Sequence, residues 1–585
     1  MRLHFERWGT TLAAVIAGLA ALGIVIACIW LGPLNQDEGW YLYAALERAA
    51  GRSPYSDFFF TQGPLLPAVY GWLVPLWGNS GVLGGRVVTA LLGVVAALLA
   101  ALLAGRLAPV PTRYPAAVVG FTLCACAVYH VYFMVIPKTY ALTAVVFTGG
   151  LLSLSRLKQN SRAVWWQAAT GGFLLALAAG VRLSFGAALP VVGLWLLWHW
   201  RSYGCAWLYF GVGGVSGLLL VYGPAVIAAP ENFVFAQTFH MGRGGGGVLF
   251  IAGSMARLLR GYQALAAAAV VAAVWHLALV KCAQEDTPLA VTRKLESGGG
   301  VLCLLAVTAV GGVHLLSPFP YDDYQVPLMP ALAAVVAAWL VGLGQRMRRP
   351  EVARVGLVWG VLLFSGVAAL AAPQVQEWFV IRQDRFWPVT KSKSDLKVLR
   401  EVGDKLRRAG RREEAAPLLT PDIYLAVEAG RRVPHGFEMG PFGYFPGLKT
   451  ETARRLLVLN YELLTDIFAS GVAPDAATSG YAWAIGAPLM DELPVVEQES
   501  INKALRYYYT EVERIPDFGQ GWTELILWRL NSVEDGDTID RAREKEAGAG
   551  DIARRGTGGD SPPAFQTGGV NSGQSDGTLP LGGGL

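Results

Sequence analysis

Acidic residues stand between aromatic ones in the stretch that follows the first apolar run of the chain. Asp37 and Glu38 lie within the segment Asn35 to Tyr43, and Asp57 precedes three consecutive phenylalanines. A carboxylate near the low-dielectric face of a membrane costs several kcal/mol unless a partner or a chemical task retains it. We therefore interpret residues 35–67 as a catalytic loop. Asp37 is its candidate general base, with Glu38 or Asp57 as a second carboxylate.

Two of these acids also have a structural interpretation. An acid in the first turn of a helix is stabilised by the helix dipole by about 0.3–1 kcal/mol, which would account for Asp37. Asp57 follows Pro54, and this pattern favours an Asx-type turn.

Basic residues at the ends of apolar runs could hold an anionic leaving group. Lys138 follows Pro137 between two such runs, and Arg182 interrupts an apolar stretch, so both are expected near a membrane face, where a lipid phosphate lies. A departing phosphate needs such cations as its charge grows. The further candidates are Arg86, His240 and Arg243. For Lys138 and Arg182 the alternative is snorkelling to lipid headgroups, and for His240 it is a surface or packing role.

A second acidic pair occurs in Tyr321-Asp322-Asp323-Tyr324. Paired carboxylates could bind a divalent metal, but no third ligand is in view, so the pattern favours a solvated loop. No metal ligand is assigned, and a bound divalent metal stays an open alternative. The six cysteines lie in or beside apolar runs, which leaves no external segment able to form a disulfide of its own.

Composition places the chain among membrane proteins. Of its 585 residues, 54% are hydrophobic and 16% are charged, and the mean hydropathy is +0.41. The net charge is only +5, from 48 basic and 43 acidic residues, which gives nucleic-acid binding little support. Membrane lipids are instead the expected surroundings.

Apolar runs long enough to cross a bilayer recur through the first two thirds of the chain. The first reaches Leu31 and is interpreted as an uncleaved anchor with its N-terminus in the cytoplasm. About eleven spans are predicted in total, the others being roughly 82–105, 115–136, 139–155, 164–181, 183–200, 205–228, 262–280, 298–316, 326–344 and 353–372. Every second connection between spans is basic, and basic connections favour the cytoplasmic side of an inner membrane. The acidic connections and everything after about residue 373 are therefore expected on the external side.

The segments outside the membrane differ in kind. The first loop, about 32–81, shows the capping-box pattern Asn35-x-x-Glu38 and a Pro64-initiated helix, which predict two aromatic-rich helices lying flat in the interface. The loop 229–261 is rich in glycine and could close over a substrate. We divide the chain into a transmembrane domain (1–372), a small external α/β domain (373–532) and a disordered tail (533–585).

The first loop also resembles that of a known family. The pair Asp37-Glu38, the turn Gly51-x-x-Pro54-Tyr55-x-Asp57, the triplet Gly63-Pro64-Leu65 and Arg86 resemble the GT-C glycosyltransferases, most of all the bacterial group related to protein O-mannosyltransferases and lipid A aminoarabinose transferases.

The resemblance covers about residues 1–372. It implies a catalytic Asp37, a polyprenyl-phosphate sugar as donor, an envelope lipid, polysaccharide or protein as acceptor, and a role for the 229–261 loop in enclosing substrate. Gln62 departs from the pattern, because relatives place a Lys or His before the proline-leucine motif of this loop.

Three function classes compete on the sequence. A glycosyltransferase explains the acidic, aromatic loop. A transporter or flippase of a lipid-linked sugar would place ionisable groups at mid-membrane in broken helices. An assembly role would rest on residues 374–530. Convergence of Asp37, Lys138, Arg182 and the 229–261 loop in one cavity would favour the transferase.

Overall fold

The structure is a computed structural model that describes residues 2–155, 157, 164–238, 247–282, 298–410, 416–480 and 493–531. Two predictions fall outside these residues: the roles of His240 and Arg243, and disorder of the tail 533–585.

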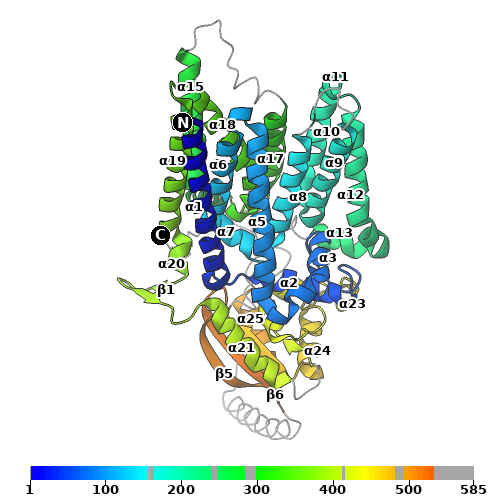
Figure 1. Ribbon diagram of the computed structural model, residues 1–585. Helices are drawn as coiled ribbons and strands as arrows, with labels where there is room; N and C mark the ends of the chain where they lie inside the picture. The colour runs from blue at the N-terminus through cyan, green and yellow to red at the C-terminus, as the bar shows by residue number, and fades with distance from the viewer. Residues whose placement is uncertain are drawn as a thin grey trace, which may run out of the picture.

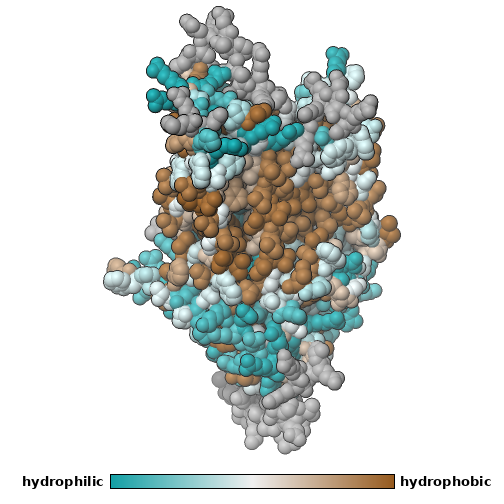
Figure 2. Space-filling model, viewed as in Figure 1, coloured by the Kyte–Doolittle hydropathy of each residue, from teal (hydrophilic) through white to brown (hydrophobic). Residues whose placement is uncertain are grey.

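Long apolar helices stand side by side and form the body of the molecule (Figure 1). Among the residues that the structure describes, six apolar segments are long enough to cross a membrane. Within them lie α1 (Arg2–Leu31), α5 (Gly81–Leu107), α9 (Val164–Val181), α12 (Ala206–Ala228), α18 (Met329–Leu343) and α19 (Pro350–Leu370). Their outward side chains form a broad hydrophobic belt with polar surface on both sides of it (Figure 2). The chain is a helical, multi-pass membrane protein.

Two further segments are bent pairs of helices that together are long enough to span. Helices α6 (Arg113–Ala125) and α7 (Val128–Val135) meet at 71°, and α14 (Gly247–Gly261) and α15 (Gln263–Cys282) meet at 88°. In the described ranges the bundle also contains three shorter apolar helices, namely α8 (Thr139–Leu154), α10 (Ala188–Trp198) and α17 (Gly299–Leu315). A helix stands at each predicted span, whereas length and composition alone support six to eight crossings, so the count of eleven stays a prediction.

The first loop contains the predicted helices, but one of them is buried. Helix α2 (Gln36–Ala49) begins with the capping box, in which Asn35 and Glu38 each bond the other's backbone N–H. Its Trp40 and Tyr41 are each only 6% exposed, so α2 does not lie in the lipid interface as predicted. The next helix, α3 (Leu65–Trp72), ends on the exposed Trp72.

Burial of α2 has a clear cause, which is the part of the chain that follows α19. The α2 ring of Trp40 packs edge-on against Phe442, with centroids 4.4 Å apart. The backbone of Tyr424 in α22 (Ile423–Ala429) passes so close to Gly39 that a Cβ there would lie 2.2 Å from its nitrogen. The first loop and the C-terminal part, which is the chain after α19, therefore share one hydrophobic core.

The C-terminal part combines helices with a four-stranded sheet at one end of the bundle (Figure 1). The strand order is β3 (Leu418–Leu419), β4 (Asp475–Ser479), β6 (Thr523–Leu530), β5 (Tyr509–Phe518); β3 and β4 are parallel and the other pairs antiparallel. This part also contains, in its described residues, the helices α21 (Asp395–Gly410), α23 (Thr450–Arg455), α24 (Tyr461–Ser470) and α25 (Val495–Tyr508). A two-stranded hairpin of β1 (Val380–Gln383) and β2 (Pro388–Thr390) joins it to α19.

Candidate active site

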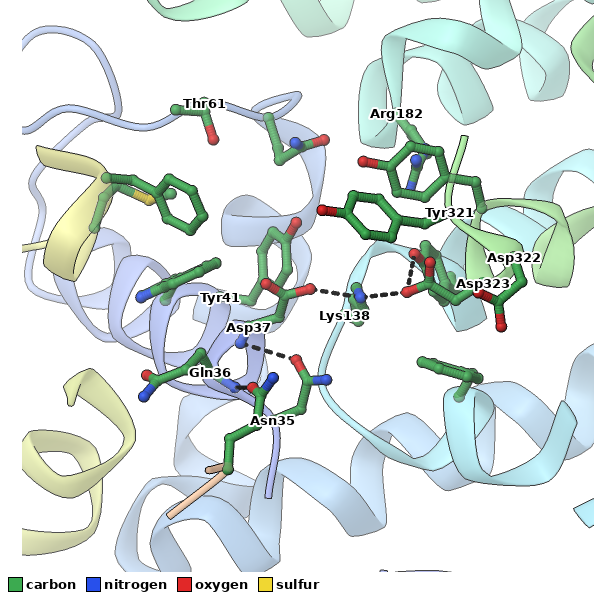
Figure 3. A pocket seen from close by; sticks show the side chains of 18 residues that line it. Asn35, Gln36, Asp37, Tyr41, Thr61, Lys138, Arg182, Tyr321, Asp322 and Asp323 are labelled. Carbon is green, nitrogen blue, oxygen red and sulfur yellow. Dashed lines mark hydrogen bonds and ion pairs between the residues drawn. The ribbon is translucent and has the colours of Figure 1, made fainter. Parts of the chain in front are cut away.

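A polar cavity of about 320 Å³ lies where the bundle, α2 and the C-terminal part meet. Its walls come from stretches far apart in sequence. They are the start of α2, Thr61 and Gln62 of the first loop, the link between α7 and α8, the short helix η5 (Asp322–Leu328), the C-terminal segment containing Met439 and Phe442, and Gln520. Arg182 reaches it from the end of α9 (Figure 3). The cavity thus lies at the edge of the membrane-spanning body, as a site for a lipid headgroup requires.

Asp37 lies in the first turn of α2, and its side chain lines this cavity. Asn35 is the N-cap, and its side-chain oxygen accepts the backbone N–H of Asp37 at 3.1 Å. The Asp37 side chain is 20% exposed, which leaves its carboxylate accessible from the cavity. The cap fixes the backbone, so the carboxylate is presented from a rigid helix end.

Lys138 lies at the centre of the charged groups. Its ammonium is 2.6 Å from Asp37 Oδ2 and 2.7 Å from Asp323 Oδ2, and these two acids approach it from opposite sides (Figure 3). Burial by itself lowers the pKa of Lys138, but the Asp323 and Asp37 carboxylates outweigh it and hold the pKa well above its ordinary value. Lys138 is therefore a permanent cation in this cavity.

The acidic pair of η5 belongs to the cavity wall, where the sequence favoured a solvated loop. Asp323 also accepts the Tyr140 hydroxyl at 2.9 Å. Asp322 accepts the Tyr129 hydroxyl at 2.6 Å and pairs with Arg257 at 3.1 Å. Sequence reasoning missed these two acids as pocket residues, although their aromatic neighbours repeat the pattern of the first loop.

Arg182 supplies a second cation. Its guanidinium carbon lies 4.2 Å from the ring centroid of Tyr324 and 5.3 Å from that of Tyr140. Within the described part of the chain no carboxylate forms an ion pair with Arg182, and its side chain lines the cavity, where it could contact an anion.

Glu38 and Arg86, predicted as catalytic acid and phosphate contact, are instead bonded to each other out of reach of the cavity. Both side chains are fully buried, and two Arg86 N–H groups donate to the two Glu38 oxygens at 2.7 Å. The remaining Arg86 donors go to the carbonyls of Ile29, Gly32 and Pro33. With all five donors used, this pair fixes the turn between α1 and α2, which corrects both predictions.

Asp57 is also corrected. It is exposed, its carboxylate accepts the Ser53 backbone N–H at 2.6 Å, and it does not line the cavity. Asp57 therefore has a role in a turn, but not the Asx type that the sequence favoured, because its carboxylate accepts an N–H four residues before it and not two residues after it.

The C-terminal part contributes contacts that no sequence motif signalled. Gln520 accepts the Gln36 backbone N–H at 2.7 Å, and the Gln36 amide donates to Asp422 at 2.8 Å. Gln36 precedes Asp37, so these bonds connect the C-terminal part to the residue beside the candidate base. In the described ranges no group of three His, Cys, Asp or Glu side chains is arranged to hold a metal ion.

Comparison with known proteins gives structural neighbours but no sequence relatives. No family model matches the chain, and no curated protein matches it. The crystal structure of ArnT from Cupriavidus metallidurans bound to undecaprenyl phosphate aligns with a TM-score of 0.55 at 14% identity, covering 88% of this chain and 98% of that one. The apo structure of the same protein aligns with a TM-score of 0.57 at 14% identity, covering 88% and 97%. The chain therefore has the fold of ArnT.

Proposed function

We propose that this chain is a membrane glycosyltransferase that moves a sugar from a polyprenyl-phosphate donor to an acceptor of the cell envelope. The observation that carries the proposal is the convergence of Asp37, Lys138 and Arg182 on one cavity at the edge of the membrane body. The fold shared with ArnT, which was crystallised with undecaprenyl phosphate, agrees with it.

The reaction needs a base and an anion site, and the cavity offers both. The acceptor hydroxyl oxygen bonds to the anomeric carbon, the bond from that carbon to the phosphate oxygen breaks, and polyprenyl phosphate departs with the bonding electrons. Asp37 receives the acceptor proton. Lys138 and Arg182 stabilise the phosphate as its charge grows.

The two acids that pair with Lys138 have different roles in this arrangement. Asp37 and Asp323 both pair with Lys138 before substrate binds, and Asp323 holds the ammonium from the side opposite Asp37. A phosphate held by Lys138 and Arg182 would share the Lys138 ammonium with Asp37. Asp323 acts as the positioning partner of the cation.

Transport is the runner-up, and the placement of the charges argues against it. Asp37, Lys138 and Arg182 line one cavity at an end of the bundle, whereas a transporter is expected to place such groups at mid-membrane. The described residues of the 229–261 stretch do not line the cavity. One of them, Arg257, forms an ion pair with Asp322, which does line it.

We place this end of the bundle on the external face. Helix α5 starts at the C-terminal part, where Glu428 accepts the Val82 N–H, and runs away from it toward Arg106. Helix α18 likewise starts beside the cavity and ends before Arg346. Basic connections thus lie at the end opposite the cavity, which the positive-inside rule assigns to the cytoplasm.

A deletion strain tests the proposal directly. Its lipid extract should accumulate a polyprenyl-phosphate sugar, and an envelope component should lose that sugar. An unchanged pool of lipid-linked sugars, with every envelope glycan intact, would contradict it.

A further inference from the structure

The hairpin of β1 and β2 projects sideways from the molecule just after the last membrane helix (Figure 1). Its register pairs Arg382 with Val389 and Gln383 with Pro388. At its tip the backbone N–H of Asp384 donates to the Trp387 carbonyl at 2.9 Å, which closes a tight turn. The hairpin is therefore an ordered element with a defined tip.

The tip carries large aromatic side chains that nothing in the described chain covers. Phe386 is 74% exposed and Trp387 is 76% exposed, and Phe379 at the root of the hairpin is 53% exposed. Arg385 lies beside this surface, with its guanidinium carbon 5.7 Å from the Phe386 ring centroid, and Arg382 is exposed on β1. Exposing this much aromatic surface to water is unfavourable. An isolated two-stranded hairpin is also only marginally stable in water, so both features favour an apolar or interfacial surrounding for the tip.

The root of the hairpin fixes its height relative to the membrane. Helix α20 (Pro373–Glu377) follows α19 directly, and the next residue, Trp378, is only 7% exposed because it packs against α1 and α7. The hairpin leaves the body two residues later, and in Figure 2 this projection is level with the border between the hydrophobic belt and the polar surface. Tryptophan and phenylalanine beside arginine are the residues that favour this border, since rings sit among the headgroups and guanidinium groups bind lipid phosphates.

We propose that the β1–β2 hairpin is a membrane-surface binding element, whose Phe386 and Trp387 insert into the headgroup region of the bilayer while Arg382 and Arg385 bind phospholipid phosphates. It holds the C-terminal part against the bilayer on the side away from α12. The inference does not depend on the proposed chemistry, because it rests on the exposed tip and its height alone.

Spin labelling of the full-length protein tests the proposal. A label is attached at Gln383→Cys, with Cys205 and Cys282 replaced by Ser, and the protein is placed in nanodiscs of phosphatidylethanolamine and phosphatidylglycerol. We expect the ratio of oxygen to nickel-complex accessibility to be higher than at Ser470→Cys in α24, and to fall toward that value when Phe386→Ala and Trp387→Ala are added. A label at Thr390→Cys, in the second strand, provides an independent position should the first variant fold poorly.

Three results would overturn the proposal. The Gln383→Cys label could read as water-exposed as the α24 label, which would leave the tip in solvent. Protection of the Gln383→Cys label from both oxygen and the nickel complex would indicate a protein partner. Spin–spin broadening that disappears on dilution with unlabelled protein would indicate a second copy of this chain.

Discussion

Asp37→Asn separates a catalytic carboxylate from a structural one, because the start of α2 does not depend on the Asp37 charge. Asn35 still caps the helix, and Glu38 still bonds the Asn35 N–H at 3.0 Å. Lys138 keeps Asp323 at 2.7 Å. The cost in free energy of unfolding should therefore stay below about 2 kcal/mol.

The effect on turnover should be much larger. Asparagine cannot accept the acceptor's proton, and loss of a general base lowers rates by about 10²–10⁴-fold. That range corresponds to about 3–5 kcal/mol of activation free energy. The assay is the initial rate of sugar transfer by purified protein in nanodiscs, compared with Asp57→Asn, which removes an equal charge from an exposed turn and should leave the rate unchanged. Asp37→Asn at near wild-type rate, in a protein that melts normally, would refute the assignment of the base.

Other residues give expectations of different kinds. Lys138→Ala and Arg182→Ala should each raise the donor KM and lower kcat, because a phosphate contact acts in the ground state and strengthens in the transition state; an unchanged KM would argue against donor contact. Arg86→Met should destabilise the fold by about 3–5 kcal/mol in thermal or denaturant unfolding, since it leaves the Glu38 carboxylate buried without its cation, and a melting temperature equal to wild type would contradict the structural role. Burial raises the pKa of Asp422 above its ordinary value of 3.8, so its stabilising contribution is complete below that value and is lost as pH rises through the raised pKa. As pH rises from 4 to neutrality, the free energy of unfolding of Asp422→Asn should therefore fall less than that of wild type. Parallel curves of unfolding free energy against pH for the two proteins would count against this.

The sequence predicts the helical bundle well because lipid imposes a simple rule on it. Each span must be apolar over a membrane's thickness, and such runs are visible without knowing any contact. The capping box at Asn35 and Glu38 is equally local, and it is confirmed. Helix boundaries fixed by neighbouring residues are the kind that a single sequence reveals.

Contacts between distant segments explain what the sequence reasoning missed. Glu38 and Arg86 look like site residues because charges near a membrane suggest function, but 48 positions apart they meet and neutralise each other. Asp323 looks like a loop residue until the fold brings it to Lys138, 185 positions away. The interface prediction for α2 was wrong because the C-terminal part, which covers Trp40, gives no sequence signal of where it docks.

Turnover of a polyprenyl-phosphate sugar by the purified protein tests the central claim most directly. The protein in nanodiscs is supplied with a panel of undecaprenyl-phosphate sugars and an envelope extract as acceptor, and release of undecaprenyl phosphate is followed by mass spectrometry. We predict acceptor-dependent release from at least one donor by wild type, and a rate at least about 10²-fold lower for Asp37→Asn. Equal release by both proteins, or movement of the intact lipid-linked sugar across a bilayer without release, would contradict the account.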